Sequence, residues 1–74
     1  MPQMRKLYDK LRRRRAILAI PSLGQDLRER QRQRGSIDPA LWPDDHDYLT
    51  AEIERIEAVM ERHRDTIRNT AYLA

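Results

Sequence analysis

Residues 45–71 read DHDYLTAEIERIEAVMERHRDTIRNTA and form the one long periodic segment of the chain. One series of side chains in it follows alternating steps of four and three, which is the spacing of one face of an amphipathic helix: Leu49, Ile53, Ile56, Met60, His63, Ile67 and Thr70. The members of the apolar seam in this series are Leu49, Ile53, Ile56, Met60 and Ile67. The spacing predicts a long C-terminal helix over about residues 45–72, roughly 40 Å in length.

A second set of side chains in the same segment is acidic. At about 100° per residue it falls on the side of the helix roughly opposite the apolar seam. The members of this acidic stripe are Asp47, Glu54, Glu57, Glu61 and Asp65. Two interpretations stay open: a solvated face, or a contact with basic residues such as those of a neighbouring copy.

The N-terminal segment predicts a first helix over about residues 3–19. Pro21 disfavours helical geometry at the residue before it, so this helix is expected to end there. Its apolar residues share one face at spacings of three, four and seven. The members of this N-terminal stripe are Met4, Leu7, Tyr8, Leu11 and Leu18, with Arg15 falling among them. We expect the first helices to cover the apolar seam.

A second short helix is predicted over about residues 23–34, with Ser22 as its N-cap and Gln25 completing a capping box. Residues 35–44 form the linker, in which Asp38 and the following proline predict one turn. Leu41 and Trp42 are expected to pack against the helices, and Asp44 or Asp45 to cap the long helix; these two and Asp47 also suit the positive end of its dipole.

These elements predict an all-α fold in a single small domain over residues 1–74. The arrangement is a helical hairpin or a small three-helix arrangement with one long C-terminal amphipathic helix. Two packings satisfy the narrow apolar seam: the first helix folds back as an antiparallel hairpin, or the long helices of two chains pair.

Composition predicts a thin core. The chain has 74 residues, of which 36% are charged, and it contains no Phe and no Cys. Small domains of this kind compensate with disulfides, metals, good helix packing or association. Without cysteine, and with only two isolated histidines, we expect neither disulfide nor metal nor cofactor. Association with another protein or with the chain itself is the favoured explanation.

Several function classes are excluded on sequence grounds. The longest apolar run, residues 16–20, is far shorter than the roughly 18 residues of a membrane span, so no membrane contact and a cytoplasmic location are expected. Two glycines outside any phosphate-loop pattern argue against an enzyme or a small-molecule substrate. Residues 44–47, Asp-Asp-His-Asp, imitate a metal motif but are explained by the start of a helix.

Charge divides the chain into two unlike halves. Residues 1–35 hold eleven Lys/Arg and three Asp/Glu, a formal charge of +8, whereas residues 36–74 hold four and nine, a charge of −5. Residues 12–15 are four consecutive arginines, of which Arg12 and Arg13 are expected to face outward. The candidate contacts to a partner or to nucleic acid are Arg5, Lys6, Lys10, Arg12, Arg13, Arg28, Arg30, Arg32 and Arg34.

The sequence thus favours a non-enzymatic small helical protein that docks on a partner protein or a larger assembly. Small charged proteins of phages and other mobile elements often have this character. The alternative is a small nucleic-acid-binding regulator that uses the Arg-rich N-terminal half. Tyr8 is the only aromatic residue that interleaves with the basic run, which makes a single-strand stacking role less favoured.

Overall fold

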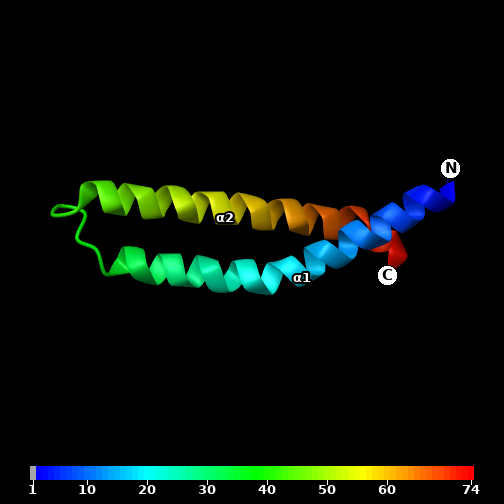
Figure 1. Cartoon of the computed structure of the whole chain (residues 1–74), viewed down its shortest axis with the longest axis horizontal. Coiled ribbons are helices and arrows are strands. Elements are labelled where there is room, and N and C mark those ends of the chain that lie inside the picture. The colour runs from blue at the N-terminus through cyan, green and yellow to red at the C-terminus, as the bar shows by residue number, and fades with distance from the viewer. Residues whose placement is uncertain (1) are drawn as a thin grey trace.

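The computed structural model describes residues 2–74, with side chains from Met4 onward. Helix α1 spans Pro2–Gly35, helix α2 spans Pro43–Asn69, and the short 3-10 helix η1 spans Ala71–Leu73. The two long helices lie antiparallel as a hairpin in a rod of 57 × 18 × 13 Å (Figure 1). The all-α prediction is confirmed, and the arrangement is the hairpin with two α-helices rather than three.

One helix, α1, stands where two short helices were predicted. It runs through Pro21, so Ser22 and Gln25 lie inside a helix and cap nothing. The proline ring removes the hydrogen bond to the carbonyl of Ile17 and crowds that carbonyl. Pro21 is exposed on the side turned away from α2, so crowding there bends α1 toward α2. Figure 1 shows this bend, beyond which the N-terminal part of α1 crosses the end of α2.

The hairpin loop follows the predicted turn at Asp38. The backbone N–H groups of Leu41 and Trp42 donate to the carbonyl oxygen of Asp38, at 3.1 and 2.9 Å. The Asp38 carboxylate accepts a further bond from the N–H of Ala40 at 2.9 Å. Helix α2 then begins with Pro43 in its first turn and Trp42 at the cap position. Asp44 and Asp45 therefore lie in the first turn as partners of the helix dipole, and neither caps it as predicted.

The core is a single thin layer between the two helices. From α2 it holds Leu49, Ile53, Ile56 and Met60, and among the described side chains of α1 only Ala16 is fully buried. Ile67, the last member of the apolar seam, is half-buried. Two helices enclose little volume, so each of these side chains carries a large share of the stability.

The face of α1 that covers the seam is not the N-terminal stripe. It consists of Ala16, Ile20, Leu23 and Leu27, at spacings of four, three and four. All four are buried or half-buried, and they lie on both sides of Pro21. Their packing against one continuous seam outweighs the local preference of proline for a helix end.

Neither helix of the described part of the chain contains an apolar run of the length that a bilayer crossing requires.

Candidate functional site

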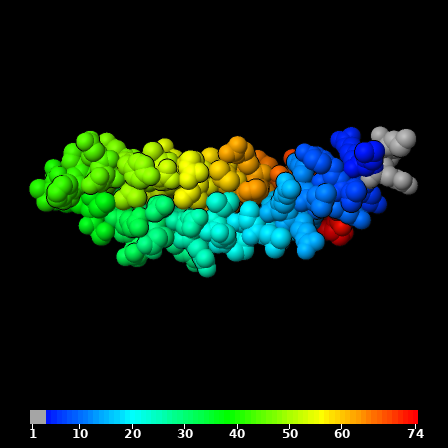
Figure 2. Space-filling model, in the orientation of Figure 1, coloured from blue at the N-terminus to red at the C-terminus, as the bar shows by residue number. Residues whose placement is uncertain are grey.

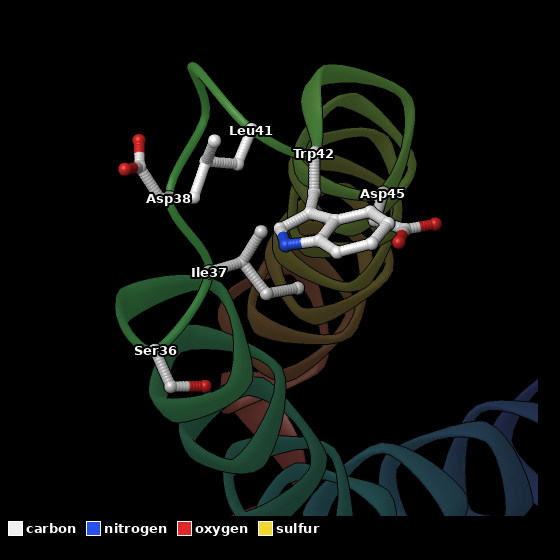
Figure 3. Close-up of a pocket in the computed structure, with 6 residues that line it drawn as sticks. All are labelled: Ser36, Ile37, Asp38, Leu41, Trp42 and Asp45. Carbon is white, nitrogen blue, oxygen red and sulfur yellow. The ribbon is translucent and has the colours of Figure 1, made fainter.

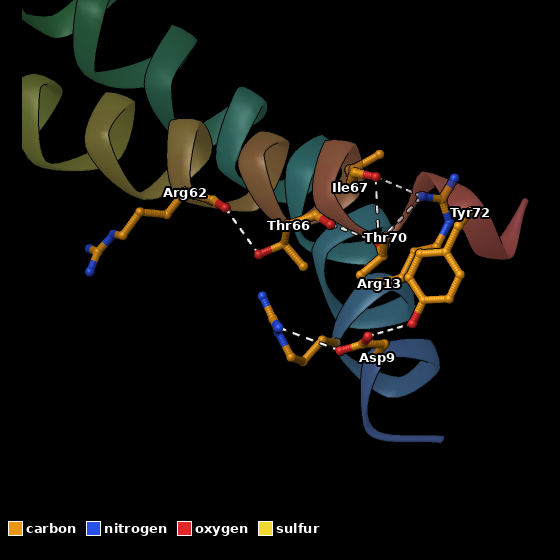
Figure 4. A network of polar contacts seen from close by, with 8 residues as sticks. Asp9, Arg13, Arg62, Thr66, Ile67, Thr70 and Tyr72 are labelled. Atoms are coloured by element: carbon orange, nitrogen blue, oxygen red, sulfur yellow. Dashed lines mark hydrogen bonds and ion pairs between the residues drawn. The ribbon is translucent and has the colours of Figure 1, made fainter. Parts of the chain in front are cut away.

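The open end of the hairpin is closed by Arg13. Its Nη1 donates to the carbonyl oxygen of Ile67 at 2.8 Å and to Oγ1 of Thr70 at 3.4 Å. Thr70 is buried, and its hydroxyl donates to the carbonyl of Thr66 at 2.6 Å (Figure 4). A guanidinium suits the negative end of the α2 dipole. Arg13 thus packs inward against α2, contrary to the expectation that it faces solvent.

A second contact joins the two chain ends. The Tyr72 hydroxyl donates to the Asp9 carboxylate at 2.5 Å, and Arg12 lies 3.6 Å from the other oxygen of that carboxylate. The hydrogen bond to Asp9 raises the pKa of Tyr72, because loss of the proton would place two negative charges side by side. These contacts fasten η1 to α1 at the level of Asp9.

The N-terminal stripe is left uncovered. Its five side chains are between 56% and 71% exposed. Figure 2 shows the first turns of α1 extending beyond the C-terminus at the end of the rod. Tyr8, Leu11, Arg12 and Arg15 line a shallow hollow of about 210 Å³, and the Arg12 guanidinium lies 5.6 Å from the centre of the Tyr8 ring. The stripe is therefore an apolar surface inside a basic frame.

The basic side chains predicted as contacts in the first turns of α1 differ in exposure. Arg5, Lys6 and Lys10 are exposed, whereas Arg12 and Arg13 are half-buried by the contacts just described. Arg14 and Arg15 are also exposed, Arg14 at the border of the N-terminal stripe and Arg15 within it. Five cations thus remain accessible on the first turns of α1.

The second predicted basic group does not form one surface. Arg28 and Arg32 are exposed, and Arg32 is paired with Glu29 at 2.5 Å, which holds the pKa of Glu29 below its ordinary value. Arg30 and Arg34 are half-buried, and Nη1 of Arg34 donates to Oγ1 of Thr50 on α2 at 3.4 Å. This group therefore divides between solvent and the other helix.

The acidic stripe is exposed along its whole length. Glu61 and Asp65 form ion pairs with Arg68, at 2.8 Å in the case of Glu61, and these carboxylates raise the pKa of Arg68. Among the described side chains, Asp47, Glu54 and Glu57 form no ion pair within 4.0 Å. Within the described residues, the loop-side half of the stripe is therefore not paired with cations.

The loop end carries a second apolar surface. Leu41 and Trp42, expected to pack against the helices, are 70% and 60% exposed. With Ile37 they surround an open hollow of about 440 Å³. Figure 3 shows Ile37 between Leu41 and the Trp42 indole, with the carboxylates of Asp38 and Asp45 at the border. This surface is apolar inside an acidic frame.

The described residues offer no cluster of three or more His, Asp or Glu side chains that could hold a metal ion. His46 is the fourth residue of α2, and His63 is half-buried at a position that continues the spacing of the apolar seam. Neither belongs to a cluster of this kind among the described residues.

Comparison with known protein families, with curated proteins and with solved structures finds no match to this chain. The candidate surfaces therefore rest on the geometry alone.

Sequence reasoning missed two features of these surfaces. The face of α1 that packs on α2 was not predicted, because the expected helix end at Pro21 placed Ala16 and Ile20 in one helix and Leu23 and Leu27 in another. Reading residues 16–27 as one helix would have revealed their shared spacing. The inward position of Arg13 follows from the same continuous helix, since it shares that side of α1.

Proposed function

We propose that this chain is a non-enzymatic interaction protein that docks on a protein partner through the N-terminal stripe of α1. The observation that supports the proposal is the exposure of Met4, Leu7, Tyr8, Leu11 and Leu18 along one side of the helix. Large apolar side chains exposed along one side of a small charged chain are typical of an interaction site.

Two further observations agree with a docking role. The core between α1 and α2 is thin, so burial of the stripe adds substantially to the stability of the folded chain. The contact of Arg13 with Ile67 and that of Tyr72 with Asp9 anchor α1 on either side of Leu11, so the middle of the stripe needs little further ordering on binding.

Site-specific photo-cross-linking in cells tests this proposal. A photoreactive residue replaces Leu11 in the stripe, and a matched control places it at Ala58, which is exposed on α2. We expect a discrete protein cross-link from position 11 that is absent from position 58. Equal labelling at the two positions, or none at either, would contradict a docking role for the stripe.

The second candidate is a nucleic-acid-binding regulator, which the exposed cations Arg5, Lys6, Lys10 and Arg14 favour. Fluorescence anisotropy with random-sequence duplex DNA and RNA, at low and near-physiological salt, separates the two. Sub-micromolar binding that survives physiological salt would favour the regulator. Replacing Arg5 and Lys6 with Ala should then reduce the slope of log K against log salt by about 2.

A further inference from the structure

The two ends of the rod carry surfaces of matching character and opposite charge. Residues 2–15 hold seven Lys/Arg and one Asp, a formal charge of +6, and residues 36–48 hold four Asp and no Lys/Arg, a charge of −4. The first segment, the basic end, contains most of the N-terminal stripe. The second, the acidic end, contains Ile37, Leu41 and Trp42. The hairpin places them at opposite ends of a 57 Å rod (Figure 1).

We propose that a second copy of this chain covers the N-terminal stripe, with the two rods side by side and antiparallel. The inference deepens the proposed function and rests on it. In this arrangement the basic end of each copy lies on the acidic end of the other. A two-fold axis relates the two copies, so the same contact forms at both ends of the pair. Each contact buries the apolar surfaces of the two ends and brings their opposite charges together.

Antiparallel pairing closes after two copies, because each contact is repeated by symmetry. A stable interface needs about 800 Å² per partner. One long face of the rod, 57 Å by 18 Å, has more area than that. The contact can therefore reach the required size without opening the hairpin.

A nucleic acid would bind only at the basic end and would not cover the acidic end. Phosphates would neutralise Arg14 and Arg15, but they would leave Leu7, Leu11 and Trp42 in water and would be repelled by the acidic end. A second copy satisfies all of these groups together, which is why we favour it.

A charge-swap experiment on the full chain tests the pairing. The first variant carries Arg14→Glu and Arg15→Glu at the basic end, and the second carries Asp45→Lys and Asp47→Lys at the acidic end. All four side chains are exposed. Circular dichroism establishes that each variant remains helical, and sedimentation equilibrium from micromolar to hundreds of micromolar concentration gives the oligomeric state.

We expect the unaltered chain to reach twice its mass of 8.9 kDa. Each variant alone should self-associate at least tenfold more weakly, because like charges then meet at both contacts. An equimolar mixture of the two variants should restore the dimer, because both contacts of the heterodimer are again attractive. A control with Arg28→Glu and Arg62→Glu makes the same charge change as the first variant, but away from both ends. It should dimerise to within about threefold of the unaltered chain.

Three outcomes would overturn the inference: a monomer at every concentration, a mixture that fails to restore the dimer, or growth into long polymers, which indicates an open head-to-tail contact. The proposed function is judged separately by the cross-link from position 11. A monomeric chain that still cross-links to a different protein refutes the second copy and leaves the docking role standing. A monomeric chain without a specific cross-link refutes both.

Discussion

The apolar seam of α2 and the N-terminal stripe of α1 share one helical spacing, but they differ in burial. Leu49, Ile53, Ile56 and Met60 are buried, whereas Leu7, Leu11 and the rest of the stripe lie in water. Periodicity therefore predicts a helix and its apolar side, and it leaves open whether the same chain covers that side. In this molecule α1 offers two apolar sides and α2 covers one of them.

The largest expected effect tests the burial difference directly. Ile53→Ala removes buried methyl groups from the thin core and should lower the free energy of unfolding by about 2–3 kcal/mol. Leu18→Ala, in the exposed stripe, should change it by under about 0.5 kcal/mol in dilute solution. Urea denaturation followed by circular dichroism measures both. Equal losses would break the comparison, since they would mean that the stripe is buried in the isolated chain.

A smaller effect separates two neighbouring arginines. Arg13→Ala should lower the free energy of unfolding by about 1–2 kcal/mol, because it leaves the carbonyl of Ile67 without its charged donor. Arg14→Ala should leave stability nearly unchanged, since that side chain is exposed. Thermal denaturation of the pair measures the difference. A loss of the same size from Arg14→Ala would show that total charge, and not the contact to α2, is responsible.

Gly24 offers a gain of stability on the covered side of α1. A Cβ at this position would lie 4.0 Å from Cε of Met60, an ordinary contact distance. Gly24→Ala should therefore raise the free energy of unfolding by roughly 0.5–1 kcal/mol through helix propensity alone. Denaturant titration measures the change. A decrease would indicate that α1 and α2 approach each other more closely at this level than the contact to Met60 implies.

The smallest effect concerns the contact between the chain ends. Because Asp9 raises the pKa of Tyr72, the contact contributes stability below the ordinary tyrosine pKa and loses it as pH rises through the raised value. In a chain with Tyr8→Phe and Tyr48→Phe, the remaining phenol should titrate above the ordinary range. Adding Asp9→Asn should lower that pKa. An ultraviolet absorbance titration measures the phenol pKa with and without Asp9→Asn. Identical curves would show that Asp9 does not raise the pKa of Tyr72.

Much of the fold follows from residues 45–71, because the spacing of Leu49, Ile53, Ile56 and Met60 depends on no other segment. The continuous α1 does not follow in the same way. Local preference at Pro21 predicts a break, and only the seam on another helix supplies the packing that opposes it. Leu41 and Trp42 were expected inside, but a two-helix hairpin has no third element at its loop to cover them.

The candidate surfaces were predictable to a similar degree. The exposed acidic stripe lies where helical spacing puts it. Arg5 shares the side of Ala16 and is nevertheless exposed, because the first turns of α1 extend past the end of α2 (Figure 1). The division of Arg28 and Arg32 from Arg30 and Arg34 depends on which side of α1 meets α2, and the sequence pattern of that segment does not reveal it. The placement of the basic and acidic ends at opposite ends of the rod follows from the hairpin and could not be predicted before its topology was known.

The hairpin topology also orders how the molecule opens. The contact between Arg34 and Thr50 closes a segment of 16 residues near the loop, whereas that between Arg13 and Ile67 closes one of 54. Closing the longer segment costs more chain entropy. We therefore expect the helices to pair from the loop outward and to open from the chain ends inward. Amide hydrogen exchange should accordingly be fastest near the termini and slowest toward the loop side of the core. The contact of Arg13 is then the first one between α1 and α2 that must break when the helices separate.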